Sequence, residues 1–256
     1  MPVEYVDLEA ARARSGLRMV VVPGVPSPWG EAAKGILHVK RIPYVAVRLA
    51  AADAAMAEWA GQRSGPVAIY EDEPPRGGWA EILLLAERLA PTPALIPSDA
   101  DQRALMMGIA HEVCGEMGLA WCRRNLGVHA GLTGGVGFPE AVARYLADKY
   151  AYRPEELELY RTRVVEVLGL LSARLRDQQQ AGSRFYLGDA LTALDIYSAT
   201  FMALFAPLPP DQCPMPEIMR PGFEHLDDAT RDALDPALLQ HRDFVYESFL
   251  ELPLSL

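Results

Sequence analysis

Cysteine is scarce in this sequence. Cys114, Cys122 and Cys213 are the only three among 256 residues, and a chain of this length can bury a core without disulfide bonds. The odd number and the wide spacing argue against a disulfide-stabilised scaffold. We expect buried, passive thiols, with Cys213, which lies between prolines in a loop, as the alternative candidate for a reactive thiol.

Long apolar runs are absent as well. A membrane-spanning helix needs ~18 or more apolar residues, but the densest run, residues 82–86, is flanked by Glu81 and Glu87. Residues 1–16 mix acids with arginines and contain no apolar stretch, so they do not resemble a signal peptide. We therefore expect a cytoplasmic protein with no membrane partner.

Basic residues are outnumbered. The chain has 24 Lys and Arg against 34 Asp and Glu, which gives a net charge of −10. The average field of such a protein repels a phosphate backbone. We therefore expect no nucleic-acid partner.

Motifs for metals and nucleotides are missing too. His111, Glu112 and Cys114 fall short of the two-histidine zinc motif, and the other histidines are scattered. The glycine-rich residues 131–137 follow a helical pattern and lack both the Walker lysine and the dinucleotide spacing. We expect no metal site and a flexible loop at residues 131–137.

The overall composition, with 50% hydrophobic residues, 20 Gly and 21 Pro, is typical of a soluble globular protein of one or two domains. Its first third alternates strand and helix patterns. Ser27 and Pro28 are favoured residues at a helix start. We expect strands at residues 17–22, 42–47 and 67–70, helices from 28 to about 40, at 50–59 and at 79–89, and a possible further strand at 71–76.

Prolines at residues 90–99 mark a change of pattern. Beyond them nearly every segment has the 3.6-residue period of an amphipathic helix, interrupted by a proline-rich loop at 207–221. We expect an N-terminal extension at 1–16, an α/β domain at 17–90, a linker at 91–100 and an all-helical domain at 101–256.

The order of these motifs resembles the soluble glutathione transferase family. The strand, turn, Ser-Pro-Trp helix start and Ile-Pro-Tyr strand lie within residues 17–47. Residues 65–69 are similar to the family's Pro-Val strand with its cis-proline, and residues 185–197 are similar to the capping-box helix of its second domain. The resemblance covers residues 17–250 and implies a thioredoxin-like α/β domain followed by an all-α domain.

The capping box also follows from spacing. Thr192 and Asp195 stand at N-cap and N3 positions, where each side chain can bond the other residue's backbone N–H. We expect this pair to start a central helix.

The resemblance implies glutathione as cosubstrate, bound on the first domain, and a small apolar electrophile in the cleft between domains. It implies that Ser27 donates to the glutathione thiolate and that Trp29, Gly65 and Pro66 lie at the same site. Lowering a thiol pKa from ~8.5 by two units requires about 2.7 kcal/mol, which one charge-assisted hydrogen bond and a helix N-terminus can supply. The alternative is that Ser27 is only an N-cap. The family is usually a homodimer, so we expect one here.

One part of the pattern departs from the family. An acidic residue followed by Ser normally holds the γ-glutamyl end of glutathione, and Gly78 and Trp79 stand there instead. Arg76, Glu71 and Asp72 could compensate from a shifted loop, but charged residues at such a position more often belong to a solvated turn. A catalytically inactive binding or interaction module is therefore the alternative function. Thiol-disulfide reduction is disfavoured because residues 17–90 contain no cysteine.

Tyrosines suggest one wall of the electrophile pocket. Four tyrosines could line this wall: Tyr145, Tyr150, Tyr152 and Tyr160. The alternative is that they belong to the helical core, where aromatic residues at this spacing are more common.

Overall fold

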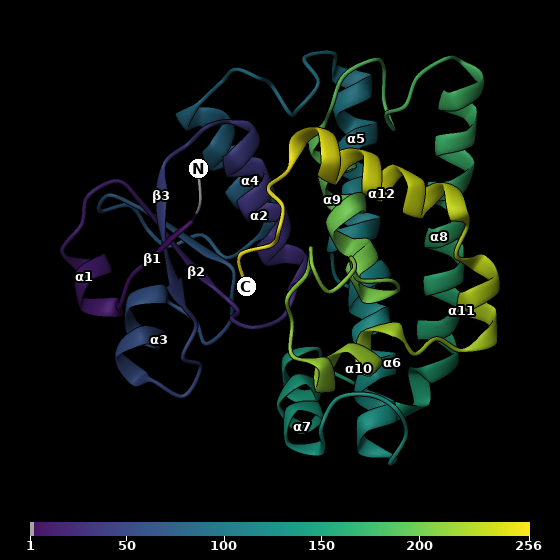
Figure 1. Cartoon of the computed structure of the whole chain (residues 1–256), viewed down its shortest axis with the longest axis horizontal. Helices are drawn as coiled ribbons and strands as arrows, with labels where there is room; N and C mark the ends of the chain where they lie inside the picture. Colours follow the sequence, from purple (N-terminus) through teal and green to yellow (C-terminus); the bar gives the residue numbers. More distant parts are fainter. Residues whose placement is uncertain (1–2) are drawn as a thin grey trace.

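The computed structural model describes residues 3–256. A four-stranded sheet with its helices occupies one side of the molecule, and a bundle of helices occupies the other (Figure 1). The elements of the first part are β1 (Glu4–Tyr5), α1 (Leu8–Arg12), β2 (Leu17–Val21), α2 (Pro28–Val39), β3 (Tyr44–Arg48), α3 (Ala54–Ala60), β4 (Val67–Tyr70) and α4 (Trp79–Leu89).

The sheet has the order β1-β3-β2-β4, with β4 antiparallel to β2 and the other pairs parallel. Successive residues of a strand point to opposite faces. Met19 accordingly belongs to the large core shared with α2 and α4, whereas Val20 belongs to a smaller core with Met56 and Ala60 of α3. The expected α/β arrangement of this part is confirmed.

Two details of the sheet differ from the sequence-based expectation. Residues 4–5 pair with Val45 and Ala46 as an added edge strand, where no element was expected. The possible strand at 71–76 is reduced to a single bridge between Arg76 and Ala68. Pro74 and Pro75 explain the shortening, because neither has an N–H to donate to a ladder.

The second part is helical, as expected. Its α-helices are α5 (Ala100–Cys114), α6 (Leu119–Leu132), α7 (Glu140–Lys149), α8 (Leu157–Gln180), α9 (Ala193–Phe201), α10 (Arg220–Glu224), α11 (Asp228–Ala233) and α12 (Pro236–Phe249). Three 3₁₀ turns are η1 (Pro154–Glu156), η2 (Met202–Leu204) and η3 (Glu217–Met219). Every residue of α9 is buried, and the helix contacts α2, α5 and α12, so it joins the two parts (Figure 1).

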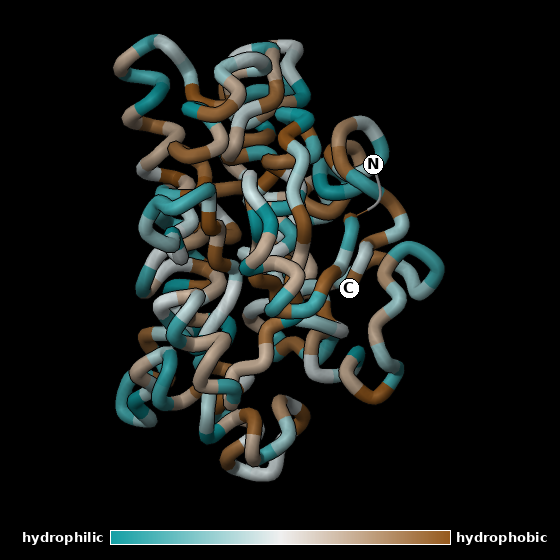
Figure 2. Tube along the Cα trace, turned by 90° about the vertical axis from the view of Figure 1, so that its left-hand side faces the viewer, coloured by the Kyte–Doolittle hydropathy of each residue, from teal (hydrophilic) through white to brown (hydrophobic). Residues whose placement is uncertain are grey.

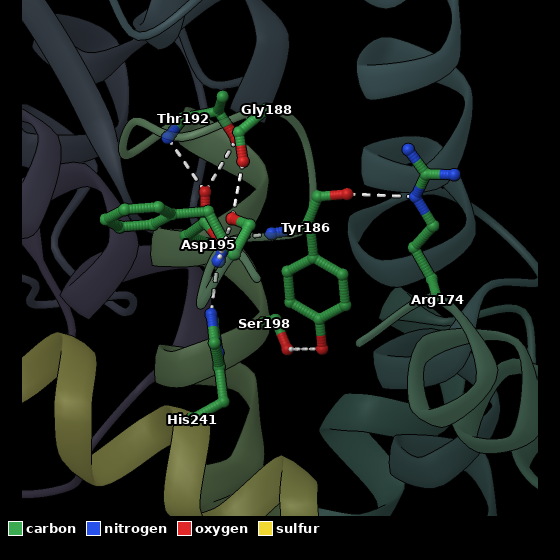
Figure 3. A network of polar contacts seen from close by, with 9 residues as sticks. Arg174, Tyr186, Gly188, Thr192, Asp195, Ser198 and His241 are labelled. Atoms are coloured by element: carbon green, nitrogen blue, oxygen red, sulfur yellow. Dashed lines mark hydrogen bonds and ion pairs between the residues drawn. The ribbon is translucent and has the colours of Figure 1, made fainter. Parts of the chain in front are cut away.

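The start of α9 is the centre of a buried polar network (Figure 3). The predicted capping box is present: Asp195 Oδ2 accepts from the Thr192 backbone N–H and from the Thr192 hydroxyl, both at 2.8 Å. Asp195 Oδ1 accepts from the Tyr186 backbone N–H at 2.9 Å and lies 3.1 Å from His241 Nε2. The Tyr186 hydroxyl bonds Ser198 at 2.8 Å. One carboxylate therefore holds together α9, the loop before it and α12.

The segment between α4 and α5 is fixed to the first part by a buried lysine. Lys40 Nζ donates to the carbonyl oxygens of Ala90 and Pro93 and forms an ion pair with Glu87, each at 2.8 Å. The same Glu87 oxygen accepts from the Leu95 N–H at 2.8 Å. Three polar partners compensate the burial of the lysine charge.

Hydropathy follows the packing. Hydrophobic and hydrophilic segments alternate along the chain (Figure 2), and the buried hydrophobic residues form the core. Within residues 3–256, none of the helices combines the length and the apolar character needed to cross a membrane. The three thiols are free and buried, as expected. Burial raises the pKa of Cys114 and raises that of Cys122 to about 12.

The glycine-rich residues 131–137 make a turn whose two ends are packed. A side chain at Gly131 would meet the Phe138 carbonyl at 2.3 Å, and one at Gly137 would meet the Gly127 carbonyl at 2.6 Å. The glycines are there because this turn lies against the backbone of α6. The two ends of this segment are therefore packed, whereas residues 133–136 between them are exposed, and their flexibility stays a prediction.

Candidate functional site

Helix α2 begins beyond the carboxyl end of β2. Ser27 is its N-cap residue, with extended backbone angles, and Pro28 takes the first helical position. The Ser27 carbonyl accepts from the Glu31 N–H at 2.8 Å, but within the described chain its hydroxyl makes no capping hydrogen bond. The residue is 6% exposed. The alternative in which this hydroxyl serves as the cap is therefore not supported by the geometry.

Gly65 and Pro66 lie beside the same end of β2. Their peptide bond is cis, as predicted. Val67 pairs with Val20, so the antiparallel register brings Gly65 next to Val22. A side chain at Gly65 would lie 3.2 Å from the Val20 carbonyl oxygen, which favours glycine there. The Gly65 N–H and carbonyl make no hydrogen bond with other described residues.

Helix α4 begins at the same edge of the sheet. Arg76 bridges Ala68 in an antiparallel pair, and this register carries Gly78 toward Pro66. Gly78 is the N-cap of α4, and its N–H donates to Glu81 Oε2 at 2.9 Å. The N-termini of α2 and α4 therefore both lie near the cis peptide bond.

The indole of Trp79 lies against the helical part. Its ring meets that of Tyr197 edge-on, with centroids 5.5 Å apart, and lies 6.4 Å from the His111 ring. The Trp79 carbonyl accepts from the Tyr197 hydroxyl at 3.1 Å. Trp79 thus helps to join α4 to α5 and α9.

Arg76 is paired within the chain. Its Nη2 lies 2.6 Å from Glu73 Oε2, and Arg88 reaches the same oxygen at 2.6 Å. Hydrogen bonds from Arg88 and Arg76 lower the pKa of Glu73. Arg76 would have to leave Glu73 before it could hold a ligand carboxylate, so its charge does not replace the missing acidic residue and serine directly.

Trp29 anchors the start of α2 to the helices. Its indole N–H donates to the Cys114 carbonyl at 3.0 Å, and its ring packs edge-on against Phe201 with centroids 5.1 Å apart. The Tyr150 ring lies 6.1 Å away. Trp29 therefore lies at the boundary between the start of α2 and the helical part.

The four tyrosines divide into two groups. Tyr160 is fully buried in the core, and Tyr152 bonds His129 at 2.7 Å. Tyr150 packs against Trp29, and Tyr145 donates its hydroxyl to the Arg63 carbonyl at 3.0 Å. Only Tyr145 and Tyr150 therefore contact the first part or its boundary.

The contact between Tyr145 and Arg63 was not predicted. It joins α7 to the loop before β4, across 82 residues of sequence. The position of a tyrosine near a helix end does not predict a partner that lies so far away in the sequence. Metal ligation is not indicated either: no group of three His, Cys, Asp or Glu in residues 3–256 could hold a metal ion.

Comparison with solved structures decides the fold. A glutathione S-transferase from Methylobacterium radiotolerans, in complex with glutathione sulfonate, matches with 18% identity and a TM-score of 0.59, covering 91% of each chain. The chain has the glutathione transferase fold. The prediction of a thioredoxin-like α/β domain followed by an all-α domain is thereby confirmed.

Other structures with this fold match as well. One from Methylobacillus flagellatus with glutathione bound gives 16% identity and a TM-score of 0.61, covering 90% of this chain and 95% of that one. A β-etherase from Sphingobium gives 14% identity and a TM-score of 0.59, covering 91% and 99%. No protein-family profile matches the sequence, and comparison with curated proteins gives no match. The fold thus occurs here with a sequence far from those neighbours.

Proposed function

We propose that the protein transfers the thiol of glutathione to a small apolar electrophile, with Ser27 as the catalytic residue. The observation that carries this proposal is the Ser27 hydroxyl, which stands at the start of α2 without a capping bond. Because the hydroxyl makes no capping hydrogen bond, it can donate one to an incoming thiolate. Neighbours with this fold that hold glutathione or glutathione sulfonate support glutathione as the cosubstrate.

The proposed chemistry uses few groups. The N-terminus of α2 and the Ser27 hydroxyl stabilise the thiolate, and the thiol proton passes to solvent. The thiolate sulfur then attacks the electrophile: a sulfur–carbon bond forms as the leaving group departs with its electron pair. The unpaired N–H and carbonyl of Gly65, beside Pro66, would pair with the cysteinyl backbone of glutathione.

Each part of the chain has a role in this proposal. The α/β domain, residues 17–90, holds glutathione, and the helical domain, residues 101–256, holds the electrophile. The linker, residues 91–100, connects the two domains. Tyr145 and Tyr150 lie where the helical domain faces the first one. Within the N-terminal extension, Glu4–Tyr5 add an edge strand to the sheet. We place the reaction in the cytoplasm.

The altered start of α4 predicts weak recognition of the γ-glutamyl group. Two or three charge-assisted hydrogen bonds are missing at Gly78 and Trp79, and each contributes about 1.5–3 kcal/mol. We expect millimolar affinity for glutathione in calorimetric titration, and nearly equal affinity for cysteinylglycine, which lacks the γ-glutamyl group. The double variant Gly78→Glu, Trp79→Ser should bind glutathione at least tenfold more tightly and gain nothing for the dipeptide.

The dipeptide is the control in this experiment, because a general change in the site would alter both affinities. Micromolar affinity of the unmodified protein for glutathione, with a large loss for the dipeptide, would show that other residues hold the γ-glutamyl end.

A homodimer is the expected assembly, and exposed leucines on α4 and α5 suit it. Leu84 of α4 and Leu105 of α5 are 55% and 39% exposed, and Gly108 leaves open space beside Leu105 along α5. Burying a leucine contributes about 1.5–3 kcal/mol. Leu105→Glu should therefore weaken dimerisation about tenfold or more in sedimentation equilibrium, whereas Leu170→Glu, on the 42% exposed position of α8, should not. A monomeric unmodified protein at micromolar concentration would reject this assembly.

A second function is supported by the start of α4. An inactive binding module would keep the fold while losing the acidic residue and serine, and the pairing of Arg76 with Glu73 agrees with that. Turnover of glutathione with chlorodinitrobenzene distinguishes the transferase from the binding module. If the rate at saturating glutathione does not exceed that of the uncatalysed reaction, the binding module is favoured.

A further inference from the structure

A groove opens at the end of the sheet opposite the candidate functional site. It lies where the paired strands β2 and β3 begin, at Leu17 and Tyr44, whereas Ser27 follows the other end of β2. Its volume is about 920 Å³, which falls in the ~300–1,000 Å³ range of small-molecule sites. The groove is therefore large enough for a ligand and separate from the proposed reaction.

The floor of the groove is apolar. The ends of α2 and of the two strands form it, with Leu17, Leu37, Ile42, Tyr44 and Val45. Leu17 and Leu37 are buried and belong to the large core, so the floor is held in place by the packing of the whole α/β part. Such a surface favours the apolar part of a ligand.

The N-terminal extension forms one wall of the groove, and its charges are paired. Glu4 and Arg14 lie on this wall and form an ion pair at 2.7 Å. Glu251, which also lines the groove, is engaged in an interaction of its own. The acids among the described lining residues are therefore committed, and Arg14 would have to leave Glu4 before it could bind a ligand.

Arg41 is the cation that remains available. Its side chain lines the groove and is exposed, and it makes no hydrogen bond or ion pair in the part of the chain that the structure describes. Water therefore solvates the guanidinium, and a ligand carboxylate can replace that water without breaking an internal ion pair. The groove thus combines an apolar floor with one accessible positive charge.

The backbone of Arg41 is unusual for an arginine. It has a φ of 54° at the turn that ends α2, where the Ile42 N–H donates to the Leu37 carbonyl at 2.9 Å. Glycine is the favoured residue at this left-handed position of a helix end, because it has no Cβ to clash. A strained residue that is kept in place of glycine points to a role for its side chain.

We propose that this groove binds a small apolar carboxylate, such as a medium-chain fatty acid, with its chain on the floor and its carboxylate on Arg41. A guanidinium offers two parallel N–H donors, which match the two oxygens of a carboxylate. Burial of the chain supplies affinity, and Arg41 selects the anion. The inference does not rest on the proposed glutathione chemistry, because Ser27, Gly65 and Trp79 lie outside the groove.

Calorimetric titration of the full chain with decanoate, at neutral pH and below its micelle concentration, tests the site. We expect decanoate to bind at least tenfold more tightly than 1-decanol, which has the same chain and no charge. Arg41→Gln should lose about tenfold in decanoate affinity and nothing for decanol. Arg12→Gln is the matched control, because it removes an exposed arginine of α1 outside the groove.

Two further variants separate binding from folding. Arg41→Gly places the favoured residue at the left-handed position, so its urea midpoint should stay nearly unchanged while its decanoate affinity falls as in Arg41→Gln. Ser15→Trp fills the groove from an exposed position on its wall, so it should weaken decanoate and decanol alike.

Three results would overturn the proposal: no decanoate binding, equal affinity for decanoate and decanol, or equal affinities in Arg41→Gln and Arg12→Gln. Tighter binding of inorganic phosphate than of decanoate would overturn the choice of an apolar carboxylate. A lower sedimentation mass in Ser15→Trp would make the groove a contact between copies of this chain instead. Glutathione affinity should be the same in Arg41→Gln as in the unmodified protein, so failure of either proposal is visible on its own.

Discussion

Replacing Asp195 by alanine is expected to lower the free energy of unfolding by about 3–5 kcal/mol, the largest effect of any single change that we predict. The carboxylate is completely buried and accepts from the backbone N–H groups of Tyr186 and Thr192. Its removal leaves those donors, and the His241 ring, unpaired inside the protein, and each unsatisfied buried group costs about 1–3 kcal/mol.

Urea denaturation followed by circular dichroism measures this loss. Asp189→Ala is the matched control, because Asp189 is exposed in the same loop and its removal should change stability by no more than about 0.5 kcal/mol. A loss below about 1 kcal/mol in Asp195→Ala would show that the network of Figure 3 is not what holds α9 in place.

Ser27→Ala is expected to reduce turnover at neutral pH by about tenfold or more while leaving stability almost unchanged. The hydroxyl makes no capping bond, so its loss should cost less than the ~1 kcal/mol of a lost N-cap. Without its hydrogen bond the thiolate is less stable, so the pKa of bound glutathione should rise by about one unit for each 1.4 kcal/mol lost. Because a higher pKa leaves less thiolate at neutral pH, the rate deficit should shrink as the pH is raised.

The pH profile of kcat/KM for the electrophile, taken at saturating glutathione, measures both the turnover and the pKa of the bound thiol. Ser64→Ala, in the loop before β4, is the control and should behave as the unmodified protein. An unchanged midpoint in Ser27→Ala would transfer the activating role to a backbone N–H at the start of α2.

Local signals predicted much of this fold. Ser27 and Pro28 marked the start of α2, the Gly65–Pro66 pattern anticipated the cis bond, and the spacing of Thr192 and Asp195 located α9. Each depends on residues within three positions of one another, where side-chain and backbone chemistry act directly.

What the sequence did not reveal depends on distant partners. Strand β1 has only two residues, too few for an alternating pattern, and exists because β3 offers an open edge. The pairing of Tyr145 with Arg63 arises only when α7 packs against the loop before β4.

A crystal structure of the protein soaked with glutathione tests the central claim most directly. The account predicts the glutathione sulfur within hydrogen-bond distance of the Ser27 hydroxyl, the cysteinyl backbone paired with Gly65, and a γ-glutamyl end with few contacts at Gly78. Glutathione bound elsewhere, or bound with its sulfur away from Ser27, would contradict it.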